Sequence, residues 1–215
     1  MGKHSCRLKS CLIISILLLL VCGCSADEGQ GTPFRDDFED SRSGWGAHED
    51  EALSRGYADG EYYIKLDKAN WFAWAYPGAQ FDDASVEVNA YLSSGSQDGH
   101  FGVLCRHKDE DNFYYFAISA DGYYAIFRRE NGGDLEIITG DGEGMIYSTD
   151  IRTGGQINNI QAVCQGDELS LYVNGKLLES VNDDTHTQGD VGLGAGSGPE
   201  GDTHVRFDDF SVDRP

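Results

Sequence analysis

Aromatic rings beside hydrogen-bonding side chains are the groups in this sequence best suited to ligand binding. Trp71 directly follows Asn70, and Trp74 lies three positions after Trp71. The face of an aromatic ring stacks on C–H groups, while indole N–H and phenolic hydroxyl groups form hydrogen bonds. This combination suits a sugar, which presents both C–H and hydroxyl groups. The predicted ligand-binding residues are Asn70, Trp71, Trp74, Glu87, Tyr114 and Tyr123.

Core packing is the competing interpretation for each of these rings. On a strand, Phe72, Trp74 and Tyr76 share one face, and Trp71 points to the other. We therefore expect at least one of the two sets to be buried in the core.

Paired carboxyl groups are required for the usual mechanisms of glycoside hydrolysis, at a separation of about 5 Å or of about 6.5 to 9.5 Å. Two residues spaced i and i+2 on a strand lie roughly 6.5 to 7 Å apart on one face and could form such a pair. However, Glu87 stands alone on its expected strand, and Asp109, Glu110 and Asp111 fall in an expected hairpin turn. We assign no catalytic residue, and the sequence favours binding over catalysis.

Calcium is the ion for which the sequence offers candidate ligands, since it takes six to eight oxygen atoms. Asp36, Asp37, Asp208 and Asp209 would converge if the first and last strands paired. There is no Asp-x-Asp-x-Asp-Gly loop, and the histidines show no ligand-like spacing, so we expect them at the surface. We assign no metal ligand and no cofactor, with calcium as the alternative.

Cys105 and Cys164 are the cysteines that remain once the expected signal segment and a modified Cys24 are set aside. Each lies in a strand-like run, and such cysteine pairs commonly form disulfides in exported proteins, which reach an oxidising environment. We predict a disulfide between neighbouring strands, with Cα atoms within about 7 Å.

The first 23 residues have the pattern of a signal peptide. Lys3, Arg7 and Lys9 precede an apolar run over 12–21, about half the roughly 20 residues that span a bilayer. The sequence Val21-Cys22-Gly23-Cys24 resembles the lipobox of bacterial lipoproteins, which implies cleavage before Cys24 and attachment of acyl chains such as palmitate. An ordinary secretory signal, or lipidation at Cys22, is the alternative.

Two or more acyl chains give stable anchoring, whereas a single chain binds a membrane only marginally. We therefore expect an exported protein held by lipid on the outer face of a bacterial membrane. Loss of Lys3, Arg7 and Lys9 changes the formal charge from −21 to −24, since 13 Lys plus Arg then face 37 Asp plus Glu. This charge disfavours nucleic acid as a partner. We expect the negative charge to keep the domain soluble, in preference to forming an acidic recognition surface.

The rest of the chain divides into a tether and one domain. Residues 24–33 are small and polar and predict a flexible linker, and residues 34–215 are long enough for one domain with a large core. Val86, Val88, Ala90 and Leu92 alternate with polar residues, as in a half-buried strand.

Turn signals separate further strand-like runs in this domain. Asn174-Gly175 and Asp121-Gly122 lie between apolar runs and predict tight hairpins. The runs on both sides of Asp121-Gly122 are apolar on both faces, so we expect them to be covered on both sides. Glycine-rich stretches at 139–144 and 192–198 are expected to be turns.

About twelve short strands, without convincing helical periodicity, predict two packed antiparallel sheets in an all-β jelly-roll sandwich. We expect the segments 34–38 and 205–212 to lie side by side and to close the domain near its tether.

Several fold-making segments resemble the concanavalin A-like lectin/glucanase sandwiches, in particular the laminin-G-like and 3-keto-disaccharide hydrolase-like groups. They are Asp37-Phe38, Gly44-Trp45, Asn70 to Trp74, Phe101 to Val103, Asp109 to Tyr114, Leu171 to Gly175, Gly189 to Leu193 and Phe207 to Phe210. The resemblance spans nearly all of 34–215. Glucanase relatives carry Glu-x-Asp-x-x-Glu along one strand, and this sequence lacks that motif.

Three functions are compatible with these observations. The first is a non-catalytic domain that binds glycans or another ligand, and it is the one that the residues favour. The second, which the resemblance implies, is a glycoside-processing hydrolase. The third is a structural or protein-interaction module, since a fold alone does not specify chemistry.

Overall fold

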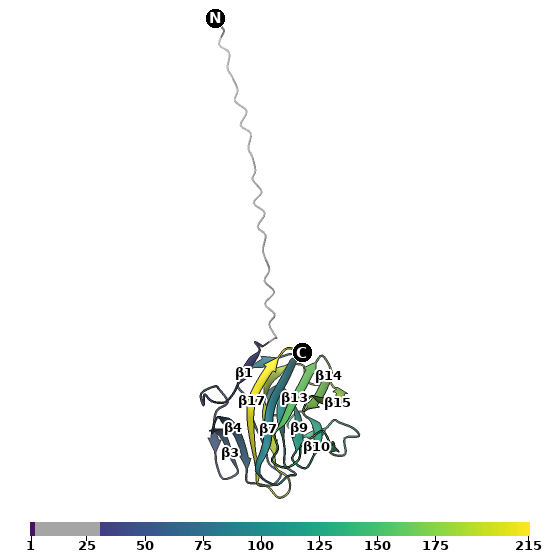
Figure 1. The fold of residues 1–215 in the computed structure, drawn as a ribbon. Coiled ribbons are helices and arrows are strands. Elements are labelled where there is room, and N and C mark those ends of the chain that lie inside the picture. The colour runs from purple at the N-terminus through teal and green to yellow at the C-terminus, as the bar shows by residue number, and fades with distance from the viewer. Residues whose placement is uncertain (3–30) are drawn as a thin grey trace.

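Two antiparallel sheets form the domain, as the computed structural model of the chain shows for residues 1–2 and 31–215 (Figure 1). The predicted signal peptide after its first two residues, Cys24 and most of the predicted tether lie outside these described residues. Within the described part of the chain, no helix has the length and apolar character needed to cross a membrane.

The described residues form a nine-stranded sheet, called sheet A, and an eight-stranded sheet, called sheet B. In spatial order sheet A contains β15 (Lys176–Asn182), β14 (Glu168–Val173), β13 (Asn158–Gln165), β7 (Ala84–Gly95), β17 (Thr203–Asp213), β4 (Glu61–Leu66), β3 (Leu53–Ala58) and β2 (His48–Glu49), with β1 (Phe34–Asp36) paired to β17. Sheet B contains β11 (Glu136–Ile137), β10 (Tyr123–Arg129), β9 (Asn112–Ser119), β8 (His100–Asp109), β16 (Gly189–Gly196) and β5 (Phe72–Ala75), with β12 (Ile146–Tyr147) on β10 and β6 (Gln80–Phe81) on β16. The predicted all-β jelly-roll sandwich is confirmed.

The main core lies between the two sheets. Val86, Val88, Ala90 and Leu92 of β7 are buried in it, as their alternation predicts. A second apolar cluster lies on the outer face of sheet B and contains Leu104, Phe113, Tyr115, Ala117, Ala125 and Phe127. Strands β9 and β10 are therefore covered on both faces, as their composition predicts.

Local turn signals mark the hairpins correctly. Asn174 and Gly175 join β14 to β15 with positive φ angles of 52° and 76°. Asp121 and Gly122 join β9 to β10, and Gly122 has a φ of 102°. Both turns need residues that tolerate positive φ, which glycine and asparagine do.

The two ends of the domain pair as expected. Strand β1 runs antiparallel to β17, with Phe34 opposite Val212. The C-terminus lies at the same end of the sandwich as β1 (Figure 1).

Cys105 and Cys164 form a disulfide, and their Cα atoms lie 6.9 Å apart. The pairing and the Cα separation are as predicted, and the two strands belong to different sheets, β8 to sheet B and β13 to sheet A. The bond therefore ties the two sheets together through the core, because both half-cystines point inward.

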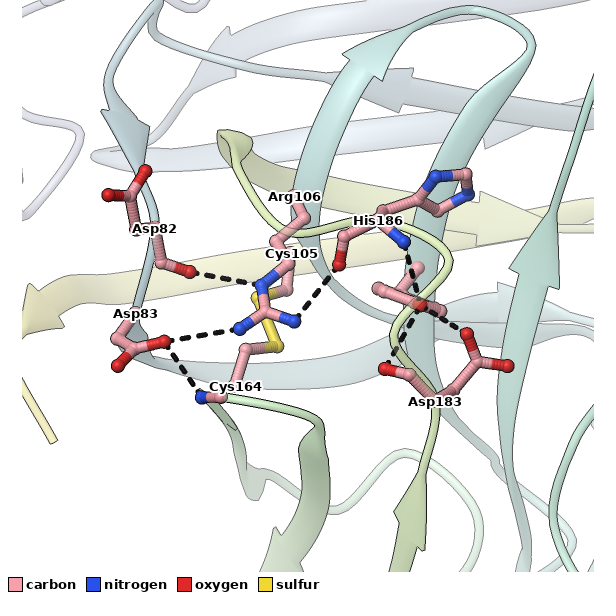
Figure 2. Close-up of a disulfide and its surroundings, with 9 residues drawn as sticks. Asp82, Asp83, Cys105, Arg106, Cys164, Asp183 and His186 are labelled. Atoms are coloured by element: carbon pink, nitrogen blue, oxygen red, sulfur yellow. Dashed lines mark hydrogen bonds and ion pairs between the residues drawn. A yellow bond between two sulfur atoms is a disulfide. The ribbon is translucent and has the colours of Figure 1, made fainter. Parts of the chain in front are cut away.

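Arg106 follows Cys105 and closes this end of the core (Figure 2). Its side chain is 1% exposed, and its φ of 53° marks an irregular step in β8. The guanidinium donates to the carbonyl oxygens of Asp82 and His186, both at 3.0 Å, and to the carboxylate of Asp83 at 3.2 Å. One buried arginine therefore connects three segments at the disulfide.

Candidate functional site

Trp74 and Glu87 lie on opposite sides of the molecule. Trp74 is on the outer face of sheet B, where it packs against the second apolar cluster. Glu87 is on the outer face of sheet A, where Oε1 accepts a hydrogen bond from Asn159 Nδ2 at 2.8 Å. Because these two faces point away from each other, the predicted ligand-binding set cannot form one site.

Tyr114 belongs to the core instead of a binding surface. Its ring is fully buried, and its hydroxyl donates to Asp183 Oδ1 at 2.5 Å and accepts from the His186 N–H at 3.1 Å. Burial raises the pKa of Tyr114 to about 12. A ligand cannot reach this ring, so its prediction as a binding residue is wrong.

Tyr123 is 39% exposed on the outer face of sheet B, but it lies far from Trp74. Strands β9, β8 and β16 separate β10 from β5. The ring of Tyr123 packs edge-on against Tyr147, with centroids 5.5 Å apart.

Asn70 shapes the turn that precedes β5. It has a positive φ of 53°, and its N–H donates to the carbonyl oxygen of Gly198 at 3.1 Å. The next residue, Trp71, is 44% exposed, and Lys68 Nζ lies 5.2 Å from its ring centroid. Together with Asp50, Glu51 and Ala52, Lys68 and Trp71 line a cavity of about 390 Å³.

Strand β5 presents a continuous aromatic edge to the outside of sheet B. Phe72 and Trp74 are half-buried and Tyr76 is 44% exposed, whereas Ala73 and Ala75 between them are buried in the main core. The Phe72 ring stacks on Phe113 with centroids 5.8 Å apart. Since Trp71 is also exposed, the expectation that Trp71 or the set of Phe72, Trp74 and Tyr76 would be core is wrong.

Glycines on β16 make room for this aromatic layer. The stretch predicted as a turn from residue 192 is largely a strand, in which Gly192, Gly194 and Gly196 alternate with inward Leu193 and Ala195. A Cβ on Gly194 would lie 2.7 Å from the ring of Tyr115, and one on Gly196 would lie 2.1 Å from the ring of His100. Neighbouring rings occupy the space above these glycines.

His48 is at the surface as expected, but two other histidines are buried. His107 is 3% exposed and His186 is 2% exposed. Burial lowers the pKa of each ring, and that of His100 falls to about 4 for the same reason.

A cavity of about 290 Å³ opens along the aromatic edge of β5. We call it the β5 cavity. Its lining residues come from the hairpin of β2 and β3, from β5 and the residue after it, and from the turn between β8 and β9: His48, Leu53, Arg55, Phe72, Ala73, Trp74, Tyr76 and Glu110.

Sequence reasoning missed the polar lining of the β5 cavity. His48 and Arg55 lie in the edge hairpin of β2 and β3. Their positions in the sequence form no motif with Trp74 that would predict a shared site. Arg55 Nη1 is held by the carbonyl oxygen of Trp45 at 3.2 Å and by the hydroxyl of Tyr62 at 3.1 Å. These contacts hold the guanidinium at the wall of the cavity.

Among the described residues, Glu110 is the one whose carboxylate lines the β5 cavity. Asp50 belongs to the neighbouring cavity, where its carboxylate accepts hydrogen bonds from His48 Nε2 and from the N–H groups of Ala52 and Leu53. The bond from His48, followed by those backbone bonds, lowers the pKa of Asp50 to about 2. The β5 cavity can stack an apolar ring face and form several hydrogen bonds, whereas the described residues that line it include one carboxyl group and not the pair used in glycoside hydrolysis.

Three of the four acidic residues that were expected to converge at the terminal strands do so, and Asp208 does not line the same cavity. Asp36, Asp37 and Asp209 line a cavity of about 340 Å³ with Arg35, Phe210 and Ser211. Asp36 Oδ2 is already the acceptor for Trp45 Nε1 at 2.8 Å. Within the described residues, no group of three or more His, Cys, Asp or Glu side chains is placed to hold a metal ion.

Comparison with solved structures identifies the fold. The carbohydrate-binding module CBM66 from Bacillus subtilis is 17% identical with a TM-score of 0.53, over 80% of this chain and 92% of that one. A Bacillus subtilis protein of unknown function with a galectin-like fold is 10% identical with a TM-score of 0.63, over 86% and 96%. A β-glucanase from Bacillus licheniformis is 12% identical with a TM-score of 0.61, over 87% and 99%.

No family model matches the sequence, and no curated protein is significantly similar to it. At these low identities the structural likeness establishes a shared concanavalin A-like sandwich fold and not an activity.

Proposed function

We propose that this chain is an exported, lipid-anchored protein whose domain binds carbohydrate in the β5 cavity without catalysing a reaction. The observation that carries the proposal is the open aromatic edge of Phe72, Trp74 and Tyr76 facing the polar side chains of Arg55 and Glu110.

The chemistry of the cavity matches a sugar in two respects. Aromatic rings offer apolar faces to the C–H groups of a pyranose or furanose ring. Arg55 supplies hydrogen-bond donors, and Glu110 supplies acceptors for hydroxyl groups. Small-molecule sites commonly combine aromatic side chains with a small number of placed polar groups, and the lining of the β5 cavity contains both.

The rigidity of the aromatic edge supports binding as well. Trp74 packs against Phe113 with ring centroids 6.0 Å apart, and Phe72 packs against Tyr115 at 4.9 Å. Phe113 and Tyr115 are fully buried, so the half-buried rings of Phe72 and Trp74 rest on a fixed base. Pre-positioned rings lose little conformational freedom when a ligand binds.

The proposed anchor places this site outside the cell. The signal sequence and Cys24 support attachment to the outer face of a bacterial membrane through acyl chains. A domain held there would meet glycans of the cell envelope or its surroundings.

A hydrolase of the 3-keto-disaccharide hydrolase-like type is the alternative that the sequence resemblance suggests. Structures named as a carbohydrate-binding module and as a β-glucanase share this fold, so the fold is compatible with either function. The single carboxylate of the β5 cavity favours binding.

Replacement of Trp74 by alanine tests the proposal. We expect the full-length Trp74→Ala protein to lose at least about tenfold in affinity on a glycan array, because a central tryptophan commonly contributes about 2 kcal/mol or more to an interface. Tyr123→Ala is the matched control, since it removes an exposed ring from the same sheet face away from the cavity.

Two results would count against carbohydrate binding at this cavity. One is equal loss of affinity in both variants. The other is the absence of any glycan bound by the wild-type protein, which would favour a structural or protein-interaction role. Release of reducing sugar from a bound glycan would instead establish hydrolysis.

A further inference from the structure

His107 is a buried polar side chain without a partner. It is 3% exposed, and neither Nδ1 nor Nε2 has a hydrogen-bond partner among the described residues. Its ring lies on the outer face of sheet B, stacked on Phe113 with centroids 5.6 Å apart. An imidazole in such surroundings loses its hydration without recovering hydrogen bonds.

A second unpartnered polar group lies next to it. Asp190 of β16 is the direct strand partner of His107 in β8, and its Oδ1 is buried with no hydrogen-bond partner in the described part of the chain. Val191 points into the main core, so Asp190 points to the outer face of sheet B, as His107 does. Side chains of directly paired residues have Cβ atoms about 4.5 to 5.5 Å apart.

This pair adjoins the β5 cavity. The Tyr76 ring, which lines the cavity, lies 4.8 Å from the His107 ring, and Trp74 lies 6.1 Å from it. Tyr76 is 44% exposed and His107 is buried, so Tyr76 is the member of this stack nearer to solvent. Movement of the Tyr76 ring would open a path from the cavity to His107.

Unpaired polar atoms at this position oppose folding. A buried donor or acceptor without a partner costs the free energy of its desolvation, whereas an apolar side chain of the same shape would not. Such groups are rare in folded proteins, and each calls for an explanation, such as a functional role or a bound water or ion.

We propose that His107 and Asp190 form the deep hydrogen-bonding part of the carbohydrate site, reached when Tyr76 moves aside, and that they bind hydroxyl groups of a neutral saccharide. This inference rests on the proposed function and adds two binding residues and a substrate class to it.

The chemistry of the pair favours hydroxyl groups over charged ones. A neutral imidazole has one donor and one acceptor, which matches a hydroxyl group that both donates and accepts. Burial lowers the pKa of His107, which favours this neutral form. A sugar carboxylate would instead be repelled by Asp190.

His100 provides a matched control within the same sheet face. It is also a β8 histidine packed in the aromatic layer, with its ring centroid 6.2 Å from that of Phe72. Unlike His107, it has a partner, since Nδ1 lies 3.2 Å from the hydroxyl of Tyr115. Removal of its imidazole therefore breaks a hydrogen bond, whereas removal of the His107 imidazole breaks none.

The experiment compares His107→Leu and His100→Leu in the full-length protein. Binding is measured with neutral oligosaccharides (cellotriose, laminaritriose, xylotriose and kestose) and with trigalacturonate as the charged counterpart. We expect His107→Leu to unfold at a higher temperature than the wild type and to bind the preferred neutral sugar at least about tenfold more weakly, a difference of about 1.4 kcal/mol. We expect His100→Leu to unfold at a lower temperature with affinity within about twofold of the wild type.

A measurement on the wild type covers the case in which His107→Leu folds poorly. Nitrogen NMR signals of the His107 ring should shift on saturation with the preferred neutral sugar, because a new hydrogen bond changes their environment. Unshifted signals would overturn the inference, as would wild-type affinity in a well-folded His107→Leu protein or a preference for trigalacturonate over the neutral sugars.

Failure of this inference can be told apart from failure of the proposed function. If a neutral sugar binds and Trp74→Ala abolishes its binding while His107→Leu does not, only the role of His107 and Asp190 is wrong. If none of the sugars binds the wild-type protein, both proposals fail.

Discussion

Cys105 of β8 and Cys164 of β13 are bonded across the core, so one covalent link joins sheet B to sheet A (Figure 2). The bond closes a loop with a sequence separation of 59 residues. Two sheets held by apolar packing alone can separate in the unfolded chain, whereas bonded sheets remain connected.

Removal of this disulfide should therefore destabilise the domain markedly. For Cys105→Ala/Cys164→Ala we expect the free energy of unfolding to fall by about 4 kcal/mol, the chain-entropy estimate for a loop of this length. Urea unfolding with and without a reducing agent measures the loss. The double variant should not respond to the reducing agent, and a wild-type protein that is equally indifferent would contradict the prediction.

Asp183 should make stability depend on pH in the acid range. Burial opposes its ionisation, but hydrogen bonds from Tyr114 and Thr185 and the charge of Arg128 outweigh burial and lower the pKa of Asp183. A carboxyl whose folded pKa lies below the unfolded value of about 3.9 stabilises the fold above that pH, and this stability is lost as the pH falls through the folded pKa.

We expect Asp183→Asn to be less stable than the wild type at pH 7 by about 3 kcal/mol, since Arg128 would lose its partially buried partner. The difference should shrink as the pH falls below about 4. Urea unfolding between pH 7 and pH 2 measures it. Glu136→Gln is the control, because Glu136 pairs with the same arginine while 63% exposed, and it should cost less than about 1 kcal/mol. Parallel pH profiles for wild type and Asp183→Asn would refute the role of Asp183.

Gly194 should tolerate no side chain. A Cβ there would lie 2.7 Å from the Tyr115 ring, whose hydroxyl also donates to the Gly194 carbonyl oxygen at 3.2 Å. We expect Gly194→Ala to lower the free energy of unfolding by about 1–3 kcal/mol, as overpacking does. Gly144→Ala is the control, since a Cβ at Gly144 would meet nothing within 4 Å. Thermal unfolding compares the two, and similar midpoints would show that the aromatic layer does not need the glycine.

Cys24 should determine where the protein resides. We expect Cys24→Ala to appear in the soluble fraction or as uncleaved precursor, because the acyl chains that hold the protein would be missing. Fractionation with labelled palmitate measures this. Cys22→Ala, the matched control, should remain lipidated and membrane-bound, and label incorporated into Cys24→Ala would exclude Cys24 as the acceptor.

The sequence by itself determined several of the main strands, the two hairpin turns and the class of fold, although it predicted a turn where β16 runs. The alternation of Val86, Val88, Ala90 and Leu92 and the turn at Asn174-Gly175 are both present as predicted. These features depend on residues within a few positions of one another: side chains alternate along any strand, and a tight turn needs particular φ angles. The number of apolar strands then requires two packed layers.

The tertiary structure alone decided which residues share a site. It placed Trp74 and Glu87 on opposite outer faces, buried Tyr114, and brought Arg55 and Glu110 to Trp74. Alternation divides a strand such as β9 into two faces, but when both faces are apolar it does not say which one meets the other sheet. That choice comes from pairing between strands that are distant in the sequence, such as β16 with β8 and β5. The local sequence pattern does not specify this pairing.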